Sequence, residues 1–322
     1  MVKLGHASVA VLASFLLVSC GGDDSSPTPT GSATPTPTPP PAPPPPTFTY
    51  TQFANLTGVQ DFATACIEYG QALDGVPRLV QAFPYSGGGN IDLDAGTAIW
   101  TVTEFGGGVS ASFGPGDIVS QAADRVRYDL NTTPLPTRLS IFQSTVAGTP
   151  AAYGRRTGYL LPTGNGLQTA FCTLGVPTDP DDIPAATTVT YTDLAMDGFL
   201  IQRNPAGGNS ITSQIVSGTG TISGNTTNGS IRFSISYVVE DSAGARRTVG
   251  PISGDVDIDL SGTDRAGYFG LLNFGGMPEY QITGGFYGPQ GRETGFVVAA
   301  QLDQDSDGRP EEFLLINGYA TR

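Results

Sequence analysis

Basic side chains are scarce in this sequence. The only lysine is Lys3 and the only histidine is His6, so the other basic residues are all arginine. Fifteen basic residues stand against 29 acidic ones, which gives a formal net charge of −14. Affinity for nucleic acid depends on basic groups that neutralise phosphates. The balance therefore excludes nucleic acid as a partner, and it leaves an acidic surface that either attracts a basic partner or maintains solubility.

The same scarcity excludes several kinds of catalytic site. Beyond residue 6, the sequence has no histidine or lysine for a serine–histidine triad, a Schiff base, or a histidine ligand to zinc or haem. Paired carboxylates, as in glycosidases, and tyrosine or methionine ligands to haem stay open. No spacing singles out a carboxylate pair, and most of the twelve tyrosines are expected in cores. We therefore expect a non-enzymatic protein that needs no cofactor.

The chain begins with a short basic segment and an apolar run over residues 7–18. That run is too short to cross a bilayer but suits the core of a signal peptide. It ends in Leu17-Val18-Ser19-Cys20, which resembles the bacterial lipobox, in which the cysteine thiol accepts diacylglycerol. The alternative is an ordinary secretory signal with an incidental cysteine. We expect acylated Cys20 to anchor the protein in lipid, and Gly21 in place of aspartate favours the outer membrane.

Composition divides the chain into four parts. Residues 1–19 are predicted to be the signal peptide, and residues 20–46 are the lipidated cysteine and a proline- and threonine-rich spacer that cannot bury a core. The remainder is rich in glycine and lacks helical periodicity, which predicts short strands joined by tight turns. We divide it into a smaller β-rich domain at 47–174 and a β-barrel domain at 175–322.

Two cysteines remain besides Cys20. Outside the cytosol, an even pair predicts a disulfide between Cys66 and Cys172. The bond would close a loop of roughly 105 residues, for which the chain-entropy model gives about 4–5 kcal/mol.

The segment 47–174 is the harder part to interpret. Phe62, Ala65, Cys66 and Tyr69 recur at helical spacing, which predicts a helix within 61–81. Residues 98–103 and 138–146 are predicted strands. Trp100, the only tryptophan, is predicted to anchor the core rather than to bind a ligand.

Eight strand-like runs follow one another after residue 175. They lie near 187–201, 213–223, 230–239, 250–261, 267–274, 279–288, 294–302 and 312–321. Apolar Ile231, Phe233 and Ile235 alternate with polar residues, which is typical of an antiparallel sheet with one buried face. Eight such strands with short connections predict an all-β fold whose C-terminal part is an up-and-down barrel, with a two-sheet sandwich as the alternative.

Residues 282–298 resemble the signature near the end of the barrel in the transferrin-binding protein B family. The pattern is matched by Gly285, Phe286, Tyr287, Gly288, Pro289, Glu293 and Gly295. Residues 175–191 are similar to the segment that leads into such barrels, and residues 318–322 are similar to their terminal strand. The glycines and Pro289 predict that the signature is a structural barrel corner rather than a binding site.

This resemblance implies a small handle-like domain followed by the barrel. It also implies a lipoprotein of the outer membrane that binds a protein or small ligand, in iron, haem or other nutrient acquisition, with display that depends on an outer-membrane translocon. The chain has one such lobe and no recognisable counterpart of the family's partner-binding loops. The resemblance therefore does not imply that this chain binds transferrin itself. The alternatives are an envelope structural or interaction protein without a solute, and a carboxylate-dependent enzyme that acts on glycans.

A stretch near the C-terminus matches the start of a calcium loop. Asp303, Asp305 and Asp307 are spaced as in D-x-D-x-D-G, but Leu314 occupies the twelfth position, where such loops carry a bidentate glutamate. The stretch also falls where two strands must be joined, and Asp-Gly is an ordinary hairpin turn. The plain hairpin is favoured over a calcium site.

Overall fold

The computed structural model describes residues 47–322 except 73–76, 88, 104–109, 131–135, 164–165, 185–187, 203–209, 226–227, 260–265, 275–276 and 303–311. Residues 47–322 form one compact unit. The predicted signal peptide, Cys20 and the spacer lie outside the described residues. Within the described part, no helix is both long and apolar enough to span a bilayer.

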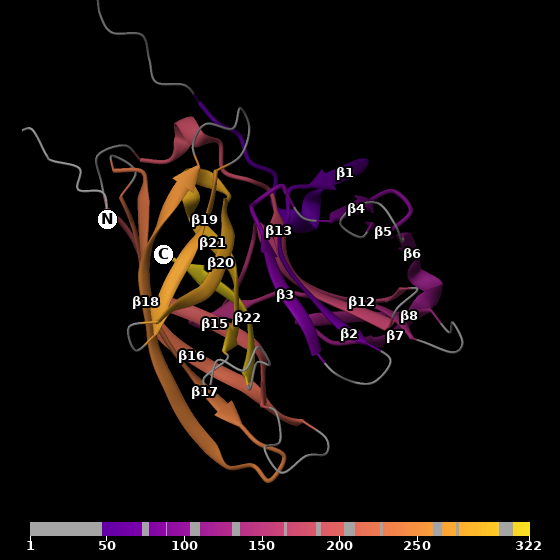
Figure 1. Cartoon of the computed structure of the whole chain (residues 1–322). Coiled ribbons are helices and arrows are strands. Elements are labelled where there is room, and N and C mark those ends of the chain that lie inside the picture. The colour runs from indigo at the N-terminus through magenta and orange to yellow at the C-terminus, as the bar shows by residue number, and fades with distance from the viewer. Residues whose placement is uncertain are drawn as a thin grey trace, which may run out of the picture. The chain divides into compact units, whose positions relative to one another are not determined.

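The C-terminal part of the unit is a closed barrel (Figure 1). Its strands are β15 (Asp193–Gln202), β16 (Ile211–Asn225), β17 (Ser230–Glu240), β18 (Arg246–Asp259), β19 (Gly267–Phe274), β20 (Met277–Tyr287), β21 (Glu293–Leu302) and β22 (Glu312–Thr321). Each pairs antiparallel with the next, and β15 pairs with β22 from Asp193↔Thr321 to Gln202↔Glu312. This last pairing closes the ring, so the predicted eight-stranded barrel is confirmed and the sandwich is not the fold.

The predicted strand at 187–201 is two strands. β14 (Thr188–Tyr191) pairs with the C-terminal half of β16, whereas β15 pairs with its N-terminal half. β14 therefore leads into the barrel but is not one of its eight strands.

The interior of the barrel is filled by side chains. The inward residues of β17, which include Ile231, Phe233 and Ile235, are fully buried, as the alternation predicts. The ring of Phe233 lies 5.4 Å from that of Tyr268 and 5.7 Å from that of Phe296, and Tyr268 lies 5.4 Å from Phe286. Such edge-to-face packing of large rings occupies the axis of a barrel of this size.

The N-terminal part, residues 47–175, contains three sheets. The seven-stranded sheet, in the order β3-β2-β13-β12-β9-β8-β7, is made of β2 (Ala65–Ala72), β3 (Pro77–Phe83), β7 (Ile118–Gln121), β8 (Arg125–Leu130), β9 (Thr137–Phe142), β12 (Gly154–Thr163) and β13 (Gly166–Gly175). The four-stranded sheet is made of β1 (Val59–Phe62), β4 (Asn90–Asp94), β5 (Ile99–Thr103) and β6 (Ser110–Phe113). The third is a two-stranded sheet of β10 (Thr145–Val146) and β11 (Thr149–Pro150).

The 3-10 turns among the described residues are η1 (Phe53–Asn55) and η2 (Pro115–Asp117) in the N-terminal part, and η3 (Pro180–Asp182) and η4 (Pro289–Gly291) after it.

A single core lies between the four-stranded and the seven-stranded sheets. Trp100 of β5 is buried in it, with its ring stacked 6.3 Å from Phe53 and 6.1 Å from Phe62. The predicted role of Trp100 as a core anchor is confirmed. The predicted strands at 98–103 and 138–146 are present as β5 and as β9 followed by β10.

The predicted helix within 61–81 is wrong, because this segment forms the end of β1, then β2 and the start of β3. β2 is buried on both faces. Cys66 points into the core between the two sheets, whereas Ile67 and Tyr69 pack against the barrel together with Val297 of β21. A strand covered on both sides carries no polar alternation, so chance apolar spacing imitates a helix.

Candidate functional site

The family-like signature forms a hairpin at the end of the barrel. Gly285, Phe286 and Tyr287 end β20, Gly288 has φ 71°, Pro289 begins η4, and Glu293 and Gly295 lie on β21. In the antiparallel register Gly285 is opposite Gly295, and Tyr287 is opposite Glu293. The structure therefore brings all seven matched residues together.

The two aromatic residues of the signature face opposite sides. Phe286 joins the core of the barrel, whereas Tyr287 belongs to a cluster with Tyr153 and Tyr319 on the side of the N-terminal part. The Tyr287 hydroxyl donates to Oγ1 of Thr173 at 3.1 Å. Burial raises the pKa of Tyr287 well above its ordinary value, so this hydroxyl stays protonated as a donor.

The carboxylate of Glu293 joins the barrel to the N-terminal part. It is 3 % exposed and accepts hydrogen bonds from the backbone N–H groups of Ala152 (2.7 Å), Tyr153 (3.0 Å) and Gly154 (3.1 Å). The Tyr319 hydroxyl donates a fourth bond, at 2.5 Å. Three successive N–H groups form an anion-binding concavity. This concavity is filled by the protein's own carboxylate, which therefore links β21 to the start of β12.

The neighbours of Glu293 keep the arrangement fixed. Burial, together with the negative charge of Glu293, raises the pKa of Tyr319 well above its ordinary value, which keeps its hydroxyl protonated. A Cβ atom at Gly154 would collide with the Tyr319 hydroxyl, so only glycine fits where the backbone meets that group.

Arg156 makes a second polar link, in which its own side chain is 10 % exposed and that of Asp197 is 39 % exposed. From β12 it forms an ion pair with Asp197 of β15 at 2.7 Å, and it donates to Oγ of Ser144 at 2.8 Å and to the carbonyl of Asn317 at 3.1 Å. Burial raises the pKa of Asp197, and the charge of Arg156 opposes that shift. These groups are used to join strands rather than to meet a ligand.

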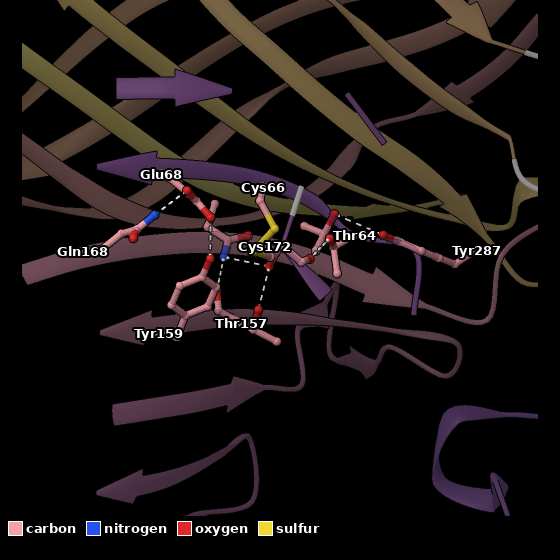
Figure 2. Close-up of a disulfide and its surroundings, with 11 residues drawn as sticks. Thr64, Cys66, Glu68, Thr157, Tyr159, Gln168, Cys172 and Tyr287 are labelled. Atoms are coloured by element: carbon pink, nitrogen blue, oxygen red, sulfur yellow. Dashed lines mark hydrogen bonds between the residues drawn. A yellow bond between two sulfur atoms is a disulfide. The ribbon is translucent and has the colours of Figure 1, made fainter. Parts of the chain in front are cut away.

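The predicted disulfide between Cys66 and Cys172 is confirmed, with an S–S distance of 2.09 Å. The two residues are direct register partners on β2 and β13. Figure 2 shows Glu68 beside them, where its carboxylate accepts from the Tyr159 hydroxyl at 2.6 Å and from the Gln168 side chain. The cysteines and Glu68 are buried, so this cluster is also structural.

A pair of acids lies on the outward face of the four-stranded sheet. Asp61 of β1 and Asp92 of β4 are register partners, so the two carboxyl groups are neighbours on one face of the sheet. A glycosidase keeps its two carboxyl groups about 5 Å or more apart so that a sugar or water fits between them. These two are direct cross-strand neighbours on one face of a sheet and do not face each other across a cleft, so this pair does not support the glycan-active alternative.

The contact between these acids predicts a pH dependence. Partial burial and then the charge of Asp61 raise the pKa of Asp92, so ionised Asp92 lowers the free energy of unfolding once the pH exceeds that raised value. Asp92→Asn should match the wild type at low pH and be more stable at pH 7, by about 1 °C in Tm.

Asp94 provides the matched control for Asp92. The Thr97 side chain and the Gly96 N–H donate to its carboxylate and lower its pKa, so its contribution is present at neutral pH and is lost as the pH falls. Asp94→Asn should therefore be less stable at pH 7, and the difference should shrink in acid. Thermal unfolding between about pH 2 and pH 7 measures both variants, because the Asp94 contribution is lost only below the ordinary aspartate pKa, and equal pH slopes for the two would contradict the assignment.

The remaining predicted site residues lie outside the described part. Cys20 precedes it, and Asp303, Asp305 and Asp307 fall in the undescribed stretch between β21 and β22. Among the described residues, no group of three or more His, Cys, Asp or Glu side chains is placed to hold a metal ion.

Sequence reasoning missed two exposed apolar residues on the outer face of the barrel. Phe269 is 39 % exposed and Leu271 is 51 % exposed, both on β19. The sequence of Gly267–Phe274 does contain the signal that predicts them. Tyr268 and Leu272 point into the core, so Phe269 and Leu271, which alternate with them, must point outward.

No protein-family model matches the sequence, and no curated protein matches it. Among solved structures, the chain is similar to a double mutant of transferrin binding protein B from Haemophilus parasuis, with 12 % identity, a TM-score of 0.46, and coverage of 80 % of this chain and 44 % of that chain. It is also similar to the haemoglobin receptor HpuA from Kingella denitrificans, with 12 % identity, a TM-score of 0.35, and coverage of 83 % and 87 %. A third similarity is to the N-lobe domain of lactoferrin binding protein B from Moraxella bovis, with 10 % identity, a TM-score of 0.33, and coverage of 83 % and 100 %. The chain thus spans less than half the length of the Haemophilus parasuis protein.

Proposed function

We propose that this chain is a lipid-anchored, non-enzymatic protein of the outer membrane that binds a protein partner on the outer surface of its folded unit. One observation carries the proposal: the interior of the barrel holds a buried core in which the rings of Phe233, Tyr268 and Phe296 are in contact. A barrel packed in this way holds its strands rigidly and leaves its outer face and loops for recognition.

The buried polar groups support the same conclusion. Glu293 accepts four hydrogen bonds, Glu68 accepts from Tyr159 and Gln168, and Arg156 pairs with Asp197. Each of these charged groups is engaged with another part of the same chain. A catalytic acid or base must be able to exchange a proton with a substrate. The hydrogen bonds and ion pairs of these groups instead join strands of the same chain.

The N-terminal sequence supports attachment to lipid. The run ending in Cys20 resembles a lipobox, and the proline-rich residues after it would act as a semi-stiff spacer between the membrane and the folded unit. The resemblance of residues 282–298 to the transferrin-binding protein B signature makes iron or haem acquisition the first setting to test, with a translocon for display.

Replacing Cys20 by alanine tests the anchor. Wild-type protein should sediment with outer-membrane vesicles and carry an acylated N-terminal cysteine, because acyl chains supply about 0.8 kcal/mol for each buried methylene. Cys20→Ala should leave the membrane fraction while keeping the same Tm. Mass spectrometry of the N-terminal peptide provides the direct readout, and an unmodified Cys20 still joined to residues 1–19 would contradict the proposal.

Binding is tested with the full mature chain as bait, from cells grown with and without iron. A nutrient-uptake component should be induced by iron limitation and should capture one saturable protein partner. Constant expression together with no saturable partner would favour a structural role in the envelope. Hydrolysis of glycan that is lost on mutation of one acid would instead favour the enzyme alternative.

A further inference from the structure

The outward face of β19 interrupts the polar surface of the barrel. On β17 and β18 most outward positions are polar, as at Arg232, Ser234 and Asp257. On β19 the equivalent positions are Phe269 and Leu271, two residues apart and therefore side by side on one face.

Other apolar side chains of the barrel are exposed as well, namely Ile211 and Val216 of β16. Single exposed apolar residues need no explanation, whereas Phe269 and Leu271 hold adjacent outward positions on one strand and mark a candidate contact surface.

The N-terminal part stops covering the barrel just before these side chains. On the neighbouring β20, the side-chain oxygen of Gln281 accepts from the N–H of Ala82 at 2.9 Å, and Thr283 is fully buried. At the start of β19, Tyr85 lies over Gly267, where a Cβ atom would be 2.5 Å from its own Cβ. Phe269 and Leu271 thus lie at the edge of a buried interface, where the side chains become exposed to solvent.

An acidic row runs along the other side of β19. Asp257 is the register partner of Phe269, and Asp259 is the register partner of Gly267. The same register places Asp255 opposite Leu271. All three carboxylates are on exposed residues of β18.

The acidic row is only partly neutralised by the chain itself. Arg232 binds Asp255 with two hydrogen bonds, at 2.8 and 2.6 Å. Asp257 takes part in none of the ion pairs formed among the described residues. Asp257 therefore keeps its negative charge directly beside Phe269.

We propose that Phe269, Leu271 and the acidic row form a docking surface, the β18–β19 patch, for a basic polypeptide segment that also carries apolar side chains. Apolar contacts would bury Phe269 and Leu271, while a lysine or arginine side chain meets Asp257. A second copy of this acidic chain would bring like charges together, and an anionic lipid surface would be repelled. The inference rests on the proposed function only in taking the outer face as the site of partner binding.

Synthetic ten-residue peptides test the patch on the full mature chain. A peptide of alternating lysine and leucine should bind saturably, whereas alternating glutamate–leucine and lysine–serine peptides should not. Leu271→Ser and Asp257→Asn should each weaken binding by about tenfold. Raising the salt from about 0.15 to 0.5 M should weaken wild-type binding more than it weakens Asp257→Asn.

Matched controls separate the patch from general attraction to an acidic protein. Val119→Ser removes an exposed apolar side chain from β7, and Asp124→Asn removes an exposed acid from the N-terminal part, and both should bind as the wild type does. Equal losses in these controls, or binding of the glutamate–leucine peptide, would overturn the proposal. A large fall in Tm for Leu271→Ser would also overturn it, because the side chain would then act as a seal for the buried interface.

The two proposals fail in different ways. If wild type and Leu271→Ser capture the same cellular partner equally well, the patch is wrong and the proposed function stands. If the lysine–leucine peptide binds at the patch but no saturable cellular partner is captured, the proposed function is wrong and the patch stands.

Discussion

Glu293→Gln is expected to lower the free energy of unfolding by about 3–5 kcal/mol. The amide would turn a donor toward at least one of three backbone N–H groups, those of Ala152, Tyr153 and Gly154, which are all donors themselves. One or more of these buried N–H groups would lose its acceptor, and the Tyr319 hydroxyl would face a weaker one. Urea unfolding, followed by tryptophan fluorescence, measures the loss.

Two further variants calibrate the Glu293 result. Tyr319→Phe removes one donor and leaves the three backbone bonds, so it should cost only about 1–2 kcal/mol. Glu240→Gln breaks an ion pair with Arg246 near the surface and should cost less than about 1 kcal/mol. Equal stability of Glu293→Gln and Glu240→Gln would show that the carboxylate does not hold the two parts together.

Replacing both Cys66 and Cys172 by alanine is expected to lower the free energy of unfolding by about 4 kcal/mol. The bond spans a sequence separation of 106 residues, so its loss gives the unfolded chain much new freedom. Both sulfurs are buried between β2 and β13, and alanine preserves the strand pairing with little lost volume. Urea unfolding without reductant measures the difference.

The reduced wild type supplies the control for the disulfide. Protein unfolded and refolded in reductant should match the double alanine variant within about 1 kcal/mol. If the reduced wild type kept its full stability, the bond would not limit the unfolded chain in the way described. Loss of folding in the alanine variant alone would indicate a packing defect at the two sites.

The barrel could be predicted because its exposed half alternates. β17 faces solvent on one side and the core on the other, so Ile231 and Arg232 differ in polarity as the period of a strand requires. β22 shows no alternation, since its outward face is covered by the N-terminal part, and its position was predicted from its length and its flanking turns. β2 is covered in the same way, and its apolar spacing therefore predicts a helix where the structure has a strand.

The candidate sites were predictable only where local sequence specifies them. The signature containing Glu293 could be recognised, but the N–H groups that it binds lie more than 130 residues earlier, in a segment without any distinctive motif. The disulfide followed from counting cysteines, because only two were left to pair. To predict that Phe269 and Leu271 are exposed, one must first know which residues of β19 face the core. To predict their acidic neighbours, one must also know the register of β19 with β18.

The pairing of β15 with β22 has a consequence for how the chain folds. Closure joins the first strand of the barrel to the last, so the sheet keeps two unsatisfied edges until residues 312–321 have reached β15. Contacts so distant along a chain form slowly. A polypeptide cut short before Glu312 would leave the backbones of β15 and β21 open to pairing with other molecules, so the last step of folding is the one at which the chain is most exposed to aggregation.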